Sequence, residues 1–303
     1  MSEPIDIVVP VLLPNDAWYN EYKKYNKNEH PGRVRDMGTF KYVLRSIDKN
    51  MPWVNKIFII LYDETQIPVW LNTNNPKIKI ILHKDLLPAE RLPNFSSVQI
   101  DMRLSFIKEL SEHFIFINDD MFFNKPIKET DYFRNGKPVH IPSMRLVNNY
   151  NNLTKAQWGK IELNNYKFLN KIIGGQRYFW TGHAPIPFNK TFQQFVWEKY
   201  RAEIEKHMSG SHVRADNNLC NWVFYNMEEC FEQTVNVPAD KLPARKYFPL
   251  SDKTTERDLA AAFNKFAILC INDGNAVSKF DRVKKMVNNV MNKKYPNKSR
   301  FEK

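Results

Sequence analysis

Short apolar runs, each bounded by turn residues, recur along the chain and predict buried strands. They span Ile5–Leu13, Lys56–Tyr62, Lys77–His83, His113–Asn118 and, much later, Lys265–Asp273. Between the early runs the apolar positions change to a helical spacing, from Phe40 to a stop at Pro52 and again over Ile100–Ser111. Strands that alternate with helices predict an α/β fold with a mostly parallel sheet.

The second half of the chain is richer in polar and aromatic residues. Lys190–Met208 and residues 217–231 have helical spacing, whereas residues 145–180 are rich in asparagine and aromatics and read as an insertion. We therefore expect one domain in two halves, residues 1–144 and 181–278, with a helical insertion between them and a terminal segment over residues 279–303.

The terminal segment predicts a basic amphipathic helix, because its apolar residues recur at Phe280, Val283, Met286, Val287, Val290 and Met291. One interpretation is a helix whose apolar side packs on the core and whose basic face is solvated. The other is a helix that contacts an acidic membrane surface.

The chain carries a formal net charge of +12, which indicates an anionic partner without saying which. It has nine glycines and neither a P-loop nor a dinucleotide-binding fingerprint. Its three cysteines show no C-x-x-C spacing, which favours reduced thiols in the cytoplasm. There is no secretory signal and no apolar stretch of the ~20 residues that span a bilayer, so we expect a soluble protein or one at a membrane surface.

Two apolar runs end in the same unusual way. "HFIFINDDMFF" leads into Asn118, Asp119 and Asp120, and "FAILCINDG" leads into Asn272 and Asp273. Ligands gather at the carboxyl ends of parallel strands, and carboxylate oxygens suit Mg²⁺ or Mn²⁺. If both ends face one cleft, they could share a metal and a diphosphate. The alternative is ordinary turn chemistry, in which Asn and Asp are common.

Further polar residues precede predicted helices or sit in loops. In "RVRDMG", Arg33 and Arg35 could clamp a phosphate and Asp36 could cap the helix that follows, although a solvated helix start explains the same residues. "SHVRADN" adds Arg214 and Asp216 ahead of another helix.

His183 lies in "TGHAPIP", between a glycine and two prolines, which predicts a stiff loop. A histidine whose pKa lies near neutrality is suited to act as a general base. A lone loop histidine is also common on protein surfaces, so the sequence by itself does not decide between a general base and a surface residue.

The run from Arg33 to Phe123 closely resembles the second conserved block of the Stealth family. "TGHAPIPFNKTFQQFVWEKY" with "VRADN" resembles the third block, "KFAILCIND" the fourth and "IDIVV" the start of the first. The first block departs from the family pattern, because "VPVLLPNDAW" lacks the usual tryptophan and first aspartate and offers Asp16 in place of the later acidic residue. Ser96 and Gly274 are smaller departures.

The resemblance implies a Rossmann-like or GT-A-like sheet and an enzyme that builds capsular polysaccharide, exopolysaccharide or other cell-surface glycans. Such an enzyme transfers a hexose- or hexosamine-1-phosphate from a nucleotide-sugar, with uridine as the implied base, to a hydroxyl of a glycan or lipid-linked oligosaccharide. The product is a phosphodiester and the leaving group is a nucleoside monophosphate. We expect a cytoplasmic enzyme whose basic terminal helix makes peripheral contact with the anionic inner face of the cell membrane, where a lipid-linked acceptor would lie.

That chemistry needs a base, cations and neutralisation of phosphate charge. We expect His183 to be the general base, Asp120 with Asp119 and Asp273 to bind Mg²⁺ or Mn²⁺ and the diphosphate, and Arg214 with Arg35 to stabilise phosphoryl charge. The expected substrate contacts are Arg33, Arg35, Asp36, Ser97, Asn118, Asp216 and Asn272.

Two other classes of function share part of this pattern. A metal-dependent glycosyltransferase would have the same sheet and acidic strand ends but would release a nucleoside diphosphate. A non-catalytic module that binds an anionic glycan would use the basic surface alone. Nucleic-acid binding is not expected, because the lysines are dispersed and no recognised motif is present.

Overall fold

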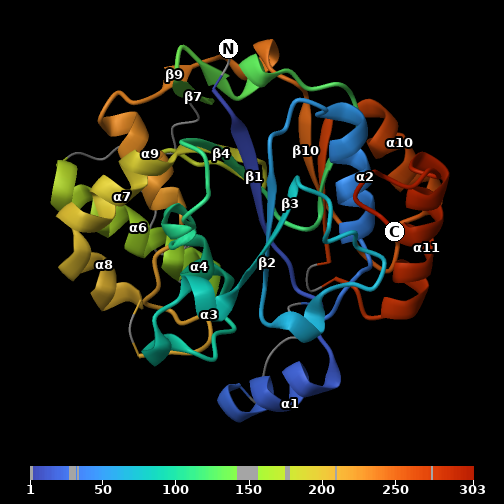
Figure 1. Cartoon of the computed structure of the whole chain (residues 1–303), viewed down its shortest axis with the longest axis horizontal. Coiled ribbons are helices and arrows are strands. Elements are labelled where there is room, and N and C mark those ends of the chain that lie inside the picture. Colours follow the sequence, from blue (N-terminus) through green and yellow to red (C-terminus); the bar gives the residue numbers. More distant parts are fainter. Residues whose placement is uncertain are drawn as a thin grey trace.

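The structure is a computed structural model that describes residues 3–26, 32, 34–141, 156–174, 178–208, 210–273 and 276–303. Its central sheet has five strands in the order β3-β2-β1-β4-β8. β1, β2, β3 and β4 run parallel and β8 runs antiparallel to β4 (Figure 1). The bounds are β1 Ile5–Pro10, β2 Ile57–Leu61, β3 Ile78–Leu82, β4 His113–Phe116 and β8 Ile186–Asn189. The predicted α/β fold with a mostly parallel sheet is therefore confirmed.

The sheet is covered on both faces, as its continuous apolar strands require. Successive residues of β1 face opposite sides, so Ile7 and Val9 join one buried cluster and Val8 joins the other. Helices α2, α10 and α11 lie on the first side and α6, α7, α8 and α9 on the second (Figure 1). Their bounds are α2 Phe40–Asn50, α10 Glu256–Lys265, α11 Phe280–Lys294, α6 Gln157–Ile173, α7 Lys190–Lys199, α8 Arg201–Met208 and α9 Trp222–Cys230.

A second sheet brings distant parts of the chain to the end of β4. It contains β10 (Arg245–Pro249), β11 (Ile268–Asn272) and β5 (Met121–Phe123). After β4 the chain turns into β5, which pairs antiparallel with β11. The late strand of the sequence therefore ends beside the turn that follows the early one.

The remaining elements are short or peripheral. A third sheet contains β6 (Phe133–Arg134), β7 (Lys137–His140) and β9 (Val235–Asn236). The other α-helices of the described residues are α1 (Asp16–Tyr25), α3 (His83–Leu86) and α4 (Ser97–Asp101). The rings of Trp18 and Tyr22 hold α1 in place by edge contacts with Phe95.

Three of the predicted helices differ from the structure. The helix expected over Ile100–Ser111 is instead α4 followed by a 3-10 turn, Leu104–Phe106. Its apolar spacing reflects burial of irregular chain rather than a continuous helix, since Leu104 and Ile107 are both buried. The helix expected over Lys190–Met208 is interrupted at Tyr200, which ends α7. The one expected over residues 217–231 begins only at Trp222.

The terminal helix α11 packs its apolar side on the core, as the first interpretation predicted. Val283, Val287 and Met291 have no exposed surface, and Val290 and Met286 are almost as buried. The apolar side is thus unavailable to a bilayer. In the described part of the chain, every helix is too short or too polar to cross a membrane.

Candidate active site

A cavity of about 510 Å³ opens at the carboxyl ends of the parallel strands. It is lined by the chain that follows β1, the β4–β5 turn, the end of β11 and the loop before β8. The structure brings ten of the predicted site residues into its walls: Arg35, Asp36, Ser97, Asn118, Asp119, Asp120, His183, Arg214, Asn272 and Asp273. Asp216 is outside this lining and pairs with Lys160 at the surface. Arg33 lies outside the described residues.

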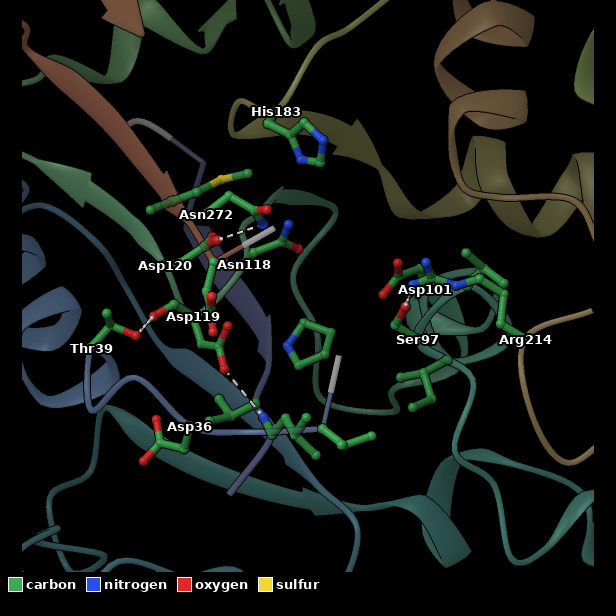
Figure 2. Close-up of a pocket in the computed structure, with 18 of the residues that line it drawn as sticks. Asp36, Thr39, Ser97, Asp101, Asn118, Asp119, Asp120, His183, Arg214 and Asn272 are labelled. Carbon is green, nitrogen blue, oxygen red and sulfur yellow. Dashed lines mark hydrogen bonds between the residues drawn. The ribbon is translucent and has the colours of Figure 1, made fainter. Parts of the chain in front are cut away.

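The two Asn-Asp strand ends meet in the cavity wall. The β4–β5 turn is closed by a hydrogen bond from the Met121 amide to the Asn118 carbonyl, and the Ile271 amide donates to the Asp120 carbonyl. The Asp120 carboxylate then faces β11, where Asn272 Nδ2 and Cys270 Sγ each lie 3.4 Å from one of its oxygens. Figure 2 shows Asn118, Asp120 and Asn272 close together, with His183 above them. Both strand ends therefore face one cleft, which is the condition under which they could act on one ligand.

The carboxyl groups of Asp119 and Asp120 are buried, and both have raised pKa values. Burial, and then the neighbouring charge of Asp120, raises the pKa of Asp119 to about 8, although the Leu12 amide donates to its Oδ2 at 3.2 Å. Burial likewise raises the pKa of Asp120 to about 6, against the contacts with Cys270 and Asn272. A divalent cation would offset this cost of ionisation, and carboxylate and amide oxygens are the donors that Mg²⁺ and Mn²⁺ prefer. The wall therefore fits such an ion chemically.

The wall is not a complete metal centre by itself. Across the described ranges, no three His, Cys, Asp or Glu side chains gather closely enough to hold an ion. Mg²⁺ is commonly held by one or two carboxylates together with substrate phosphates, so a bound diphosphate would have to supply the remaining ligands here.

Arg35 and Asp273, both predicted to act on the substrate, are bound to each other. Arg35 Nε and Nη2 donate to the two oxygens of Asp273 at 2.6 and 2.7 Å, and Nη2 also donates to the Val277 carbonyl at 2.9 Å. The guanidinium lies 4.3 Å from the centre of the Phe280 ring. In this structure the pair joins the segment before α2 to the chain that follows β11.

Asp36 does not cap α2, so that prediction is wrong. The residue before the helix is Thr39, and Asp36 instead accepts a hydrogen bond from the Gly38 amide at 2.7 Å. The Thr39 hydroxyl donates to the Asp119 carbonyl at 2.8 Å, as Figure 2 shows. The start of α2 thus supports the β4–β5 turn instead of being closed by an acidic cap.

His183 reaches the cavity because β8 runs antiparallel to β4. Ile186 pairs with Phe116, so the residues just before β8 lie beside those just after β4. The half-buried imidazole stacks on Tyr247, with ring centres 4.7 Å apart and planes 22° apart. Among the described residues its ring nitrogens have no hydrogen-bond partner. Burial, and then the charge of Arg214, lowers the pKa of His183, so the ring is neutral at pH 7 and able to accept a proton.

A further acidic residue, Asp101, faces the cavity from α4. It lies with Ser97 and Arg214, apart from the Asp120 wall (Figure 2). Arg214 Nη2 donates to Ser97 Oγ at 2.6 Å, and Asp101 Oδ1 is buried without a hydrogen-bond partner in the part of the chain that the structure describes. Burial, opposed by the charge of Arg214, raises the pKa of Asp101 to about 8. The sequence analysis missed this residue, because an aspartate beside Ile100 in a predicted amphipathic helix carries no local signal of a site.

Replacing Asp101 by asparagine is expected to make the free protein more stable at alkaline pH. The pKa of Asp101 is higher in the folded state than in the unfolded state. In the wild type, the stability that this shift contributes is fully present below about pH 4 and is lost as pH rises to about 8. Over this window the variant should gain on the wild type by at most about 1.4 kcal/mol per pH unit. Urea unfolding at pH 5 and pH 8.5 measures it. An equal difference at both pH values would contradict the prediction.

Residues 33–140 match the family described as Stealth protein CR2, conserved region 2. Over its whole length the chain is 32% identical to the capsular polysaccharide phosphotransferase WcwK of Streptococcus pneumoniae, and it covers 100% of that protein. It is 30% identical to the receptor polysaccharide phosphotransferase WefC of Streptococcus gordonii, with 100% of both chains covered. The exopolysaccharide phosphotransferase cps2G of Lactiplantibacillus plantarum is 28% identical, with 100% of this chain and 98% of that protein covered.

Among solved structures, the galactosyltransferase LgtC in complex with donor and acceptor sugar analogs aligns with 94% of this chain and 95% of its own. The identity is 10% and the TM-score is 0.43.

Proposed function

The chain belongs to the Stealth family of polysaccharide phosphotransferases, and we propose that it transfers a sugar-1-phosphate from a nucleotide-sugar to a hydroxyl of a glycan. The proposal rests on the contents of one cavity. It contains a neutral histidine (His183), two buried carboxyl groups (Asp119 and Asp120) and an arginine (Arg214). A base, a cation-binding wall and a phosphate-binding group are the parts that phosphoryl transfer needs.

The proposed reaction takes place at phosphorus. The acceptor hydroxyl oxygen attacks the phosphorus that carries the sugar, and His183 accepts the hydroxyl proton. A new bond forms between that oxygen and phosphorus, while the bond from phosphorus to the bridging oxygen of the diphosphate breaks. The nucleoside monophosphate leaves with the electron pair of that bond, and the sugar keeps its own phosphate in a phosphodiester.

The two walls of the cavity have different proposed roles. Arg214, held by Ser97, would pair with a phosphate oxygen. Asp101, whose raised pKa keeps it largely protonated at pH 7, would donate a hydrogen bond to an anionic oxygen. Asp119 and Asp120 would hold Mg²⁺ or Mn²⁺, which when bound would neutralise charge on the diphosphate. Arg33 and Asp216 remain predicted substrate contacts.

The nucleotide released by the protein tests the proposal. The purified protein is incubated with Mg²⁺ or Mn²⁺, a surface-glycan acceptor and a panel of nucleotide-sugars, with uridine sugars first. We expect a nucleoside monophosphate and a new phosphodiester signal by ³¹P NMR. A nucleoside diphosphate would establish glycosyl transfer instead, and no release from any donor would count for a binding module.

We also propose peripheral contact with an anionic membrane, where a lipid-linked acceptor would lie. The exposed cations of the α10–α11 face include Lys253, Arg257, Arg282 and Lys285, and such a contact is purely electrostatic because the apolar side of α11 is buried. Flotation should show binding to phosphatidylglycerol vesicles that salt reverses and no binding to phosphatidylcholine vesicles. Equal binding to both kinds of vesicle would contradict the proposed electrostatic contact.

A further inference from the structure

Two exposed aromatic side chains flank the proposed base. Of the described residues, five large hydrophobic side chains are strongly exposed, and Trp180 (40%) and Tyr247 (38%) are two of them. Tyr247 stacks on the His183 ring, and Trp180 lies against Gly182, the residue before His183. Large apolar side chains beside a cavity commonly mark a ligand surface.

The positions of both rings are fixed by residues of the site. The Tyr247 hydroxyl donates to Asn272 Oδ1 at 3.2 Å, which ties the ring to the wall that holds Asp120. The Trp180 ring makes an edge contact with Trp222, a residue of the cavity lining, at 6.4 Å between ring centres. A Cβ on Gly182 would come within 3.3 Å of the Trp180 ring, and Gly182 has a φ of +66°. A glycine at this position is what lets the indole lie over the loop that carries His183.

We propose that Trp180 and Tyr247 form a subsite for the sugar ring of the acceptor. This inference rests on the proposed function and adds to it where the acceptor binds. A pyranose ring has an apolar face of C–H groups. The hydrogens of these groups carry a small positive charge and are attracted to the negative face of an aromatic ring. The sugar hydroxyls point outward around the rim, so a ring stacked here can present one of them to His183.

The geometry of phosphoryl transfer assigns this surface to the acceptor and not to the nucleotide. The attacking and leaving oxygens lie roughly in line, on opposite sides of phosphorus. The proposed base contacts the attacking hydroxyl, so whatever stacks beside His183 belongs to the acceptor. The leaving nucleotide would then lie away from Trp180 and Tyr247.

Trp180→Ala is expected to raise the KM for the acceptor about tenfold or more and to leave the KM for the donor unchanged. Trp180→Tyr should restore most of the acceptor affinity, because it keeps an aromatic face. Phe195→Ala is the matched control and should leave both KM values unchanged, since Phe195 is about as exposed (42%) but lies on α7, away from the loop that carries His183.

A binding measurement gives a readout that does not depend on turnover. Methyl glycosides of glucose, galactose and N-acetylglucosamine serve as probes in saturation-transfer NMR. At least one should bind the wild type through its ring protons and bind Trp180→Ala about tenfold more weakly.

Each alternative outcome has a separate meaning. Binding of no glycoside to the wild type, or an unchanged acceptor KM in Trp180→Ala, would overturn the subsite. An increase in the donor KM instead would mean that the aromatic surface holds the nucleobase, which also overturns it. A fall in kcat that Trp180→Tyr does not restore would show a structural role for the loop, which also overturns the subsite. The proposed function fails on a different result, namely the absence of nucleoside monophosphate from the wild-type reaction.

Discussion

Replacing Asp120 by asparagine is expected to lower turnover by about 10³-fold or more and to leave the protein folded. The carboxylate lies at the point where β11 meets the β4–β5 turn, and it provides charge that the isosteric amide lacks. Since burial raises the pKa of Asp120 to about 6, its ionised form costs stability in the free protein. The variant should therefore unfold at an equal or higher temperature than the wild type at pH 7.5. Turnover and thermal unfolding, measured on the same preparation, test both parts.

Asp6→Asn is a suitable control because Asp6 is a fully buried carboxylate with a structural role. One Asp6 oxygen accepts from the Lys56 amide at 3.0 Å and the other from the Ser111 amide at 2.7 Å, at the amino end of β1, away from the cavity. This variant should lose stability and keep the activity of the folded fraction. Near-wild-type turnover in Asp120→Asn would remove Asp120 from the mechanism, and unfolding of that variant would make its role structural.

His183→Ala is expected to lower turnover by about 10²- to 10⁴-fold, the range typical of a lost general base. The imidazole stacks on Tyr247, and burial with the charge of Arg214 lowers the pKa of His183. The wild type should therefore keep a neutral base at pH 7 and lose it only at a lower pH than an ordinary histidine would. The donor KM should change little, because the base is proposed to contact the acceptor. Steady-state kinetics from pH 5.5 to 8.5 measures these effects.

Added imidazole separates a base from a positioning group. If His183 accepts the proton, imidazole in solution should partly restore His183→Ala, and the rescued rate should follow the ionisation of free imidazole. His183→Phe, which can keep the ring stacking on Tyr247, should not be rescued. Near-wild-type turnover in His183→Ala would rule out the base assignment, and equal failure of rescue in both variants would favour a positioning role.

The sequence located five of the strands, because each of these lies in a short apolar run bounded by turn residues. It did not reveal β5, β8 or β10, which are brought into the sheets by long-range pairing. β1, β2, β3, β4 and β11 all fall inside the predicted runs, each slightly shorter than its run. Helix boundaries were less well predicted. Over Ile100–Ser111 the apolar spacing came from burial of irregular chain, and at Tyr200 a helix break had no proline or glycine to mark it.

Some residues of the candidate site could be found from the sequence and others could not. Residues with an unusual local setting could be found from the sequence, such as the carboxylates after "FIFIN" or His183 between glycine and prolines. Asp101 could not, because nothing local distinguishes an aspartate in an amphipathic segment. Its significance comes from burial beside Arg214, which lies far away in the chain.

By itself the sequence determined the α/β class, the parallel strands of the central sheet and the residue types of the site, because apolar periodicity and strand-end polarity are local properties. The tertiary structure decided which of those residues meet. The antiparallel pairing of β5 with β11 placed Asn272 against Asp120, and that of β8 with β4 placed His183 beside them. It also joined Arg35 to Asp273, 238 positions apart, and buried the apolar side of α11. Such contacts depend on strand order and on long-range packing, neither of which any single segment of the sequence specifies.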